Sequence, residues 1–273
     1  MGAMSVTLHQ NWDYVDHGPA LASRTALSKP EIWHLHSAPV KDSFYRRHCK
    51  RAVDLVLAVV LLAVLLLPMA VVALCLLIAQ GRPLIYSGER MRAPGRPFRQ
   101  YKFRTMVCDD DDGGATGAHK HWRITPLGRF LRRTRLDELP QLFNIIAGDM
   151  SFVGPRPPLP EYVERFPALY ASVLQIKPGV TGLATLIYHR HEDRILANCS
   201  TAAETDRAYY ARCLPTKLRI ELVYRRVASP WLDFWIMWRT FLAVIPGLDR
   251  PRKRRGARAI RQPVPATAPE RSR

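Results

Sequence analysis

The longest apolar stretch of the chain runs from Ala52 to Ala79, and Asp54 is its only charged residue. As a helix this stretch would be about 42 Å long, which exceeds the roughly 30 Å hydrocarbon core of a bilayer. The pattern therefore predicts a membrane helix, and one spanning helix is the simplest interpretation. Residues 1–45 are polar and show no sustained period, which predicts a weakly ordered N-terminal extension.

Two features of this segment favour a re-entrant helix over a spanning one. Pro68 lies in the middle, where it removes a backbone hydrogen bond and clashes with the preceding turn, so a helix-break-helix is expected over residues 46–81. Both flanks are basic, so the positive-inside rule finds no asymmetry and is satisfied with both ends in the cytosol. The flanking cations are Arg46, Arg47, Lys50 and Arg51, then Arg82, Arg90, Arg92, Arg96 and Arg99. Both topologies remain open at this point.

Residues 82–248 predict an α/β unit that is mostly helical and holds a small sheet. Short strands are expected at 84–86 and 98–103 around a Gly/Pro turn. Helical spacing covers 127–135, 139–146, 161–174 and 202–226, with an interruption at Pro215, and KPGVTG at 177–182 predicts a turn. The tail at 249–273 is basic and rich in proline, which predicts a disordered segment that adheres to anionic lipid.

Three tryptophans recur at helical spacing near the end of this unit, in the sequence WLDFWIMWRTFLAVI. Such a stripe is typical of core packing. It is equally typical of a helix that lies in the headgroup layer of a membrane. The sequence leaves both interpretations of Trp231, Trp235 and Trp238 open.

The charge of the chain favours a polyanionic partner. Lys and Arg number 41 against 23 Asp and Glu, a formal net charge of +18. Nucleic acid, an anionic lipid surface and nucleotide phosphates all fit such an excess. The five cysteines are scattered and form no CxxC, which argues against a disulfide framework and a zinc knuckle.

The strongest candidate for chemistry is the acidic pair Asp137 and Glu138, which follows four arginines and precedes Pro140. Proline suits the first turn of a helix and disfavours helix at the residue before it, so the pair is expected at a helix junction. Backbone N–H groups at such a junction favour anions. An aspartate can attack phosphorus and form an acyl phosphate. The less specific alternative is a salt-bridged helix end, since Asp-Glu dipeptides are common.

Phosphate chemistry at this pair would need cations. A divalent ion can neutralise a diphosphate and its leaving group, and guanidinium groups match phosphate geometry. The candidate phosphate-binding residues are Lys102, Arg104, Arg132 and Arg156. The aspartates at 109–112 lack the alternate spacing of an EF-hand and predict a solvated loop. The close histidine pairs at 119/121 and 189/191 are best interpreted as surface residues.

The chain resembles the bacterial sugar transferase family, the polyprenyl-phosphate hexose-1-phosphate transferases of the small monotopic type. The resemblance runs from about Cys49 to Pro246 and rests on the order and spacing of several motifs. These are KRAVDLVLA at 50–58, PFRQYKFRTM at 97–106, LGRFLRRTRLDELPQLFNIIAGDMSFVGPRP at 127–157, KPGVTG at 177–182 and the C-terminal WLDFWIMWRT.

The resemblance implies a monotopic enzyme at the cytoplasmic face of the bacterial inner membrane, with a re-entrant helix bent at Pro68 and amphipathic helices at the interface. It implies that Asp137 attacks the β-phosphate of a UDP-sugar, that UMP leaves, and that undecaprenyl phosphate then takes the sugar phosphate. Mg²⁺ assists, with Asp137 and Glu138 as its expected ligands. Lys102, Arg132 and Arg156 match positions that hold phosphates. Nucleic acid is not an expected partner, anionic membrane lipids are, and a homodimer is left open.

The sequence departs from the family pattern at two places. Leu67 stands where many relatives have Ser before the helix-breaking proline, so the chain lacks a hydroxyl that could bond a backbone carbonyl freed at the bend. LATLIYHRHEDR follows KPGVTG where many relatives have Trp-Gln and an arginine motif, and Arg190 is the candidate to replace that arginine. The competing hypothesis is a non-enzymatic membrane anchor with a basic domain for lipid or nucleic acid, but it leaves the grouped motifs unexplained.

Overall fold

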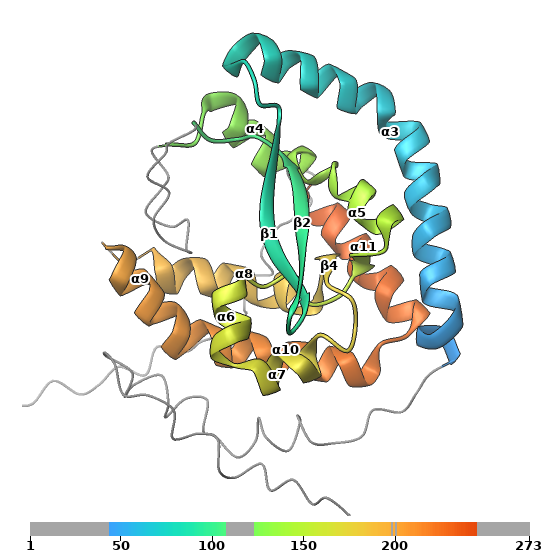
Figure 1. The fold of residues 1–273 in the computed structure, drawn as a ribbon, viewed down its shortest axis with the longest axis vertical. Coiled ribbons are helices and arrows are strands. Elements are labelled where there is room, and N and C mark those ends of the chain that lie inside the picture. The colour runs from blue at the N-terminus through green and yellow to red at the C-terminus, as the bar shows by residue number, and fades with distance from the viewer. Residues whose placement is uncertain (1–43, 108–122, 198, 200, 245–273) are drawn as a thin grey trace, which may run out of the picture.

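The computed structural model describes residues 44–107, 123–197, 199 and 201–244 (Figure 1). The first part holds η1 (Tyr45–Cys49), α3 (Lys50–Gln80), β1 (Ile85–Ala93) and β2 (Arg96–Phe103). Next come α4 (Pro126–Thr134), η3 (Leu136–Glu138), α5 (Gln141–Ala147), β3 (Ser151–Val153), α6 (Pro160–Arg165), α7 (Pro167–Val173) and β4 (Gly179–Thr181). The chain then forms α8 (Leu183–Leu196), α9 (Ala202–Ala208), η4 (Tyr209–Cys213), α10 (Leu214–Val227) and α11 (Pro230–Val244).

The predicted class, mostly helical with a small sheet, is confirmed. β1 and β2 form a long antiparallel hairpin in which Tyr86 pairs with Lys102. Two local predictions are wrong. Residues 179–181, expected in a turn, form β4, which pairs in parallel with β3. The helix expected over 161–174 is divided into α6 and α7, because Pro167 begins a new helix. The helical run over 202–226 is interrupted next to Pro215, as predicted, because the π-helical η4 separates α9 from α10 and Pro215 lies in the first turn of α10, where its missing N–H costs little.

The apolar segment forms one bent helix. α3 is continuous from Lys50 to Gln80 with Pro68 inside it, so the expected break is wrong. The ribbon nevertheless changes direction about midway, and its two arms follow different sides of the domain (Figure 1). Proline removes one backbone hydrogen bond of a helix, and packing on both sides of the bend holds the remaining turns.

Each arm of α3 packs on a different cluster of apolar side chains. In the first arm, Ala58 packs with Phe98 of β2 and Ile145 of α5. In the second arm, Met69 and Leu76 pack with residues of the hairpin and of α4. The inward residues of α3 thus tie the hairpin, α4 and α5 to one helix.

Polar side chains fix the beginning of α3 to the rest of the domain. Lys50 forms a buried ion pair with Asp233 of α11, and Asp233 also accepts hydrogen bonds from Tyr45 and Tyr224. The guanidinium of Arg51 donates to two carbonyls at the end of α5. Asp54 Oδ1 accepts the backbone N–H of Phe152, at 3.3 Å. Asp54, the lone charge of the apolar segment, therefore serves packing against β3.

The end of α3 is fixed to the same domain. The guanidinium of Arg104, which follows β2, donates to the carbonyls of Gln80, Gly81 and Arg82. The side chain of Gln80 donates to the hydroxyl of Thr125, at 3.0 Å. Helix carbonyls at a C-terminus lack intrahelical partners, so Arg104 satisfies groups that would otherwise be unpaired.

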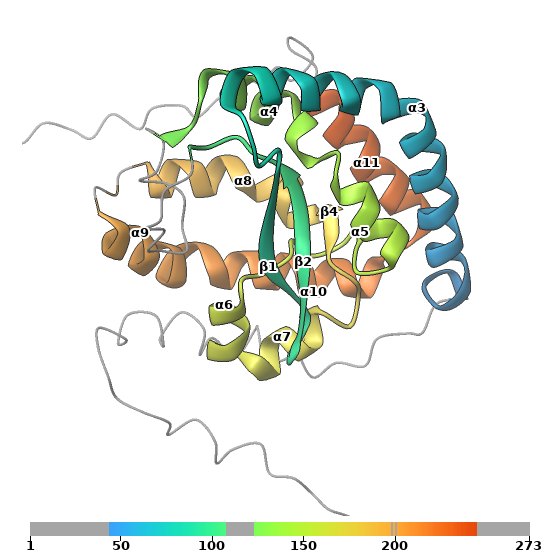
Figure 2. The same cartoon turned by 45° about the horizontal axis from the view of Figure 1, so that its top comes forward.

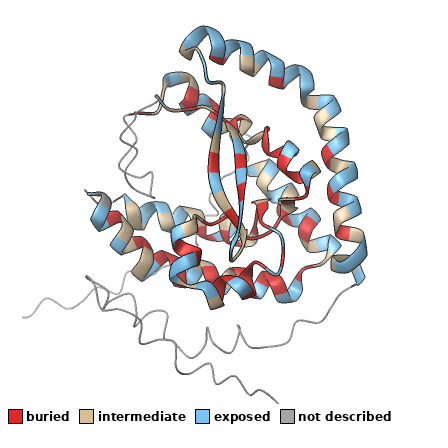
Figure 3. Ribbon diagram, in the orientation of Figure 1, coloured by how far each residue is buried: buried red, intermediate tan, exposed pale blue. Residues whose placement is uncertain are grey.

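A broad apolar surface lies on α3 and α11, which are neighbours in both ribbon views (Figures 1 and 2). Within the described residues, the helix from Tyr45 to Gln80, which comprises η1 and α3, is the one long and apolar enough to cross a membrane, and only 11% of its most apolar stretch is buried. Figure 3 shows exposed positions along its whole outer side. On α11, Asp233 and Ile236 face inward, whereas Trp231 is 75% and Trp238 is 50% exposed. The tryptophan stripe therefore lies on the surface and not in the core. Isolated apolar residues are normal on a protein surface, but neighbouring exposed apolar residues such as those of α3 and α11 mark an interaction surface.

Candidate active site

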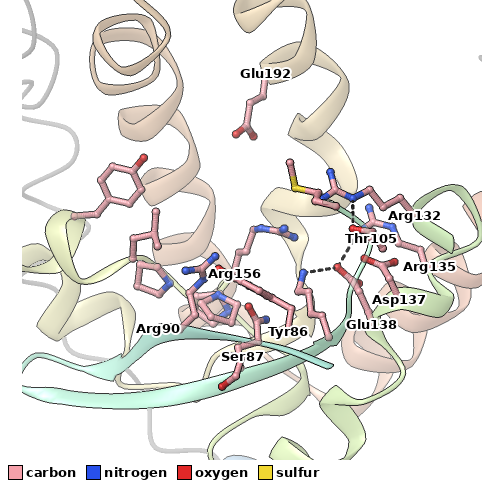
Figure 4. A pocket seen from close by; sticks show the side chains of 18 of the residues that line it. Tyr86, Ser87, Arg90, Thr105, Arg132, Arg135, Asp137, Glu138, Arg156 and Glu192 are labelled. Carbon is pink, nitrogen blue, oxygen red and sulfur yellow. Dashed lines mark hydrogen bonds and ion pairs between the residues drawn. The ribbon is translucent and has the colours of Figure 1, made fainter. Parts of the chain in front are cut away.

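A cavity of about 1280 Å³ opens between the hairpin, the α4–η3 junction, the loop before α6, and helices α8 and α10. In Figure 4 the hairpin runs below it, Asp137 and Glu138 lie on one side, Glu192 of α8 lies on the opposite side, and Arg156 lies between them. The cavity thus joins segments that are far apart in the sequence and brings acidic and basic groups together.

The chain geometry that presents the acidic pair follows from the residues around it. Thr125 caps α4 by accepting the N–H of Gly128. Arg135 ends α4 in the left-handed conformation, at φ 58°, which is uncommon for a residue with a side chain. The 3₁₀ turn of η3 follows at once and carries both carboxylates. The pair therefore lies at a helix junction, as predicted, with Pro140 as the residue before α5.

Asn144 of α5 fixes the distance between this junction and the hairpin. Its side-chain oxygen accepts the N–H of Tyr101, and its amide nitrogen donates to the carbonyl of Arg99. The side chain thereby pairs with the edge of β2 much as another strand would. Because Lys102 is the next residue of that strand, Asn144 sets where Lys102 stands relative to the acidic pair.

Glu138 is held by two cations. Its Oε1 lies 3.1 Å from Nζ of Lys102 and 3.3 Å from a guanidinium nitrogen of Arg135. Burial raises the pKa of Glu138, but Lys102, Arg156 and Arg135 outweigh burial and keep its pKa below the usual range. Burial and Arg156 lower the pKa of Lys102, with Glu138 acting in the opposite direction. Glu138 is therefore ionised and fixed in place.

Asp137 lies in a different state beside it. It is 7% exposed, and its Oδ1 is buried without a hydrogen-bond partner among the described residues. Burial and the neighbouring Glu138 raise the pKa of Asp137, while Lys102, Arg132 and Arg135 oppose that rise. An unpaired buried carboxylate oxygen costs free energy unless something binds it. Asp137 therefore has a carboxylate oxygen without a hydrogen bond, and a bound cation or electrophile would stabilise its charge.

The structure brings most of the predicted phosphate-binding residues to this cavity. Arg132 donates to the hydroxyl of Thr105, at 2.8 Å, beside Asp137 (Figure 4). Arg156 is exposed within the cavity, and its charge acts on both Lys102 and Glu138. Arg104 lines the cavity while it binds the end of α3.

Arg190 is placed elsewhere. It is exposed on α8 and is not among the residues that line the cavity. The residues that α8 contributes to the wall are Glu192, Asp193 and Leu196. A role of Arg190 in substrate binding stays a prediction.

Three residues of the site did not stand out in the sequence. Arg135 binds Glu138 directly. Lys217 pairs with Glu192 across α10 and α8. Glu221 of α10 is 5% exposed, lines the cavity, and accepts a backbone hydrogen bond from Arg156. Burial raises the pKa of Glu221 to about 8, although Lys217 and the Arg156 N–H oppose the shift. The available signal was an acid at helical spacing from Leu214 and Leu218, which marks Glu221 as buried but does not place it in the cavity.

The donor set at the junction fits a magnesium ion that is shared with a substrate. Mg²⁺ is commonly bound by one or two carboxylates together with substrate phosphates. Asp137 and Glu138 supply the two carboxylates, and Asp137 Oδ1 has no other partner in the described part of the chain. The described part of the chain contains no group of three or more His, Cys, Asp or Glu side chains able to hold a metal ion.

Comparisons with known proteins identify the family of the chain. Residues 45–247 match the bacterial sugar transferase family. A Bacillus subtilis (strain 168) protein provisionally named an undecaprenyl-phosphate N-acetylgalactosaminyl 1-phosphate transferase is 45% identical over 118 residues, which is 43% of this chain and 66% of that protein. The UDP-glucose:undecaprenyl-phosphate glucose-1-phosphate transferase of Escherichia coli (strain K12) is 34% identical over 217 residues, which is 78% of this chain and 42% of that protein.

A third relative is the UDP-N-acetylgalactosamine-undecaprenyl-phosphate N-acetylgalactosaminephosphotransferase of Aeromonas hydrophila. It is 29% identical over 236 residues, which is 82% of this chain and 51% of that protein. The chain thus spans between 42% and 66% of the length of these relatives. The family predicted from the motifs is confirmed, since the match covers most of the chain and includes Asp137 and Glu138. The chain belongs to the bacterial sugar transferase family.

Proposed function

We propose that the protein transfers a sugar 1-phosphate from a UDP-sugar to undecaprenyl phosphate, with release of UMP, and so begins the assembly of a bacterial glycan. The observation that carries the proposal is the state of Asp137, which lines a cavity large enough for a nucleotide sugar and has a buried carboxylate oxygen with no hydrogen-bond partner among the described residues. Relatives that differ in the sugar they are named for share undecaprenyl phosphate in their names. The chemistry of the site supports the same class of reaction.

In the first half of the proposed reaction, a carboxylate oxygen of Asp137 attacks the β-phosphorus of the UDP-sugar. The bond from that phosphorus to the bridging oxygen breaks, UMP leaves with the electron pair, and the sugar phosphate remains on Asp137. Arg132 and Arg156 stand where they can bind phosphate oxygens, because guanidinium groups suit such oxygens geometrically. Glu138, ionised and bound to Lys102, keeps the junction rigid.

In the second half, an oxygen of undecaprenyl phosphate attacks the same phosphorus. The bond to Asp137 breaks, the carboxylate is restored, and undecaprenyl-diphosphate sugar is the product. No proton is required in either displacement if both nucleophiles enter ionised. The raised pKa of Asp137 therefore matters, since neighbouring positive charge must keep this group available as an anion.

Mg²⁺ belongs to the proposal as the expected cofactor. Asp137 and Glu138 would hold it together with oxygens of the substrate diphosphate. When bound, the ion would neutralise the diphosphate and favour departure of UMP. A nearby cation would also lower the pKa of Asp137.

The proposal includes a re-entrant α3 and a site at the cytoplasmic face of the inner membrane. Lys50 binds Asp233 at the beginning of α3, and Arg104 binds carbonyls at its end. Since both ends are bonded to the same polar domain, a helix with its ends on opposite sides of a bilayer would break one set of bonds. The exposed aromatic face of α11 would lie in the headgroup layer, where anionic lipids attract basic side chains.

Topology is tested by labelling a single cysteine in place of Ser5, in an otherwise cysteine-free protein, with a reagent that does not cross membranes. Labelling only after the cells are opened supports a re-entrant α3. Labelling in intact cells contradicts it.

The reaction is tested by measuring UMP release from a panel of UDP-sugars with Mg²⁺, in detergent, with and without undecaprenyl phosphate. Turnover that needs the lipid phosphate supports the proposal. Binding of anionic vesicles without UMP release from any donor would favour the alternative, a non-enzymatic basic membrane protein. Parallel measurements with Asp137→Asn exclude a contaminating hydrolase.

A further inference from the structure

A second hollow, of about 460 Å³, lies on the other side of the hairpin from the acidic pair. We call it the apolar groove. Four residues of α3 around Pro68 form one wall, and residues of the hairpin and of the beginning of α5 form the other. Among the residues that the structure describes, no charged residue lines it, and Tyr101 is the one lining residue with a polar group other than the backbone. The residues used below are Ala70, Ala73, Ile85, Phe103, Pro140 and Phe143.

The apolar groove adjoins the catalytic cavity. Ile85 and Phe103 line both hollows, at the end of the hairpin where β1 begins and β2 ends. Successive residues of a strand point to opposite faces, so Lys102 faces the cavity while Tyr101 lines the groove. Pro140 lies two residues beyond Glu138 along the chain. The groove therefore leads from the bend of the membrane helix to the acidic pair.

The shape of the groove depends on small side chains. Ala70 and Ala73 are three residues apart and so lie on the same face of α3. Phe143, across the groove, is 46% exposed. Between two alanines and an aromatic side chain there is room for a branched hydrocarbon. Contact with bulk lipid alone does not explain why α3 has a recess close to the acidic pair.

We propose that the apolar groove binds the phosphate-proximal isoprene units of the polyprenyl acceptor. This inference rests on the proposed function, in which the acceptor is undecaprenyl phosphate. The acceptor must bring a charged phosphate to Asp137 while its chain stays in apolar surroundings, because burying an unpaired charge is costly. The groove provides an apolar route from α3 to the edge of the cavity. There Lys102, Arg132 and Arg156 supply the positive charge that would bind the phosphate.

The first test fills the groove by Ala70→Phe and compares it with Val71→Phe. Val71 is the neighbouring residue, is 54% exposed, and does not line the groove. Both variants enlarge the lipid-exposed surface of α3 by an aromatic ring. Ala70→Phe should raise KM for undecaprenyl phosphate at least tenfold and leave the formation of the sugar-phosphate adduct from UDP-sugar unchanged. Val71→Phe should match the parent in both.

Acceptor length gives a second readout. A short, soluble isoprenyl phosphate carries the same phosphate-proximal units, so Ala70→Phe should raise the KM for it by about the same factor as for undecaprenyl phosphate, and Val71→Phe should change neither KM. An unchanged KM in Ala70→Phe, or equal losses in the two variants, overturns the inference. If the parent itself shows no turnover, the proposed function fails instead, so the two failures are distinguishable.

Photo-crosslinking tests the groove without any turnover. A geranylgeranyl phosphate with a diazirine on its first isoprene unit should label peptides that contain Phe143 or Ala70 and Ala73. Excess undecaprenyl phosphate should suppress that label, and excess phosphatidylglycerol should not. Labelling confined to other peptides overturns the inference. Equal suppression by both lipids would identify a general acyl-chain site and would also overturn it.

Discussion

Nζ of Lys102 lies 3.1 Å from Oε1 of Glu138, and this contact joins the hairpin to the helix junction that carries Asp137. Both side chains are largely buried, so removing either one would leave the other as an uncompensated buried charge. In the described part of the chain, Oδ1 of the neighbouring Asp137 has no such partner. One carboxylate of the pair is thus fixed by the protein, and the other is left for chemistry.

Lys102→Met should destabilise the protein by about 3 kcal/mol, because it leaves Glu138 charged and buried with one cation fewer. Lys102→Met/Glu138→Leu should recover much of that stability without recovering transferase activity. Thermal unfolding in detergent and adduct formation measure the two effects. Equal instability of the single and the double variant would contradict a paired role.

Arg132→Gln should slow adduct formation by about 10²-fold, since it removes a fixed positive charge from the reacting phosphate. It should also move the acid limb of the pH–rate profile upward, because Arg132 lowers the pKa of Asp137. Arg133→Gln on the same helix is the matched control, since Arg133 does not line the cavity. A similar profile for both variants would remove Arg132 from the site.

Glu221→Gln should change how stability depends on pH. The pKa of Glu221 is raised from 4.5 to about 8, so between those values the folded protein holds a proton that the unfolded chain releases. The stability of the parent should therefore fall as pH rises through this window, by at most about 1.4 kcal/mol per pH unit from this group. Glu221→Gln should flatten the slope. Denaturant unfolding at several pH values is the measurement, and an unchanged slope would contradict the assignment.

Trp238→Glu should weaken binding to anionic vesicles by about tenfold or more, because it places a charge on the exposed aromatic face of α11. Val223→Glu changes an exposed apolar residue of α10 in the same way and should have little effect. Vesicle co-sedimentation in the absence of detergent compares them. Equal loss in both variants would mean that the α11 face is not special for the membrane.

The sequence predicts the parts of the site that are contiguous. Asp137, Glu138 and Pro140 form a helix junction because proline, the left-handed Arg135 and the short 3₁₀ turn act locally. β2 and α4 are likewise close to their predicted ranges, since local periodicity and turn residues determine them, whereas β1 runs from Ile85 to Ala93, well beyond the predicted 84–86. These elements depend little on the rest of the chain.

Long-range packing decides what the sequence could not predict. Glu221 reaches the cavity because α10 packs near the loop that carries Arg156, and no local pattern reports that contact. Pro68 bends α3 without breaking it, because both arms pack on clusters from other elements. The exposure of Trp231 and Trp238 is decided by which face of α11 meets the domain. The predicted extension up to residue 43, the acidic loop and the basic tail lie outside the described residues.

The most direct test of the account is intact-protein mass spectrometry of the detergent-solubilised protein. The sample is incubated with Mg²⁺ and a panel of UDP-sugars, without lipid acceptor. We predict a mass gain of one sugar phosphate in the parent, its absence in Asp137→Asn, and its loss from the parent when undecaprenyl phosphate is added. An adduct of the same mass in Asp137→Asn, or lipid-dependent UMP release from the parent with no adduct at any time, would contradict the account.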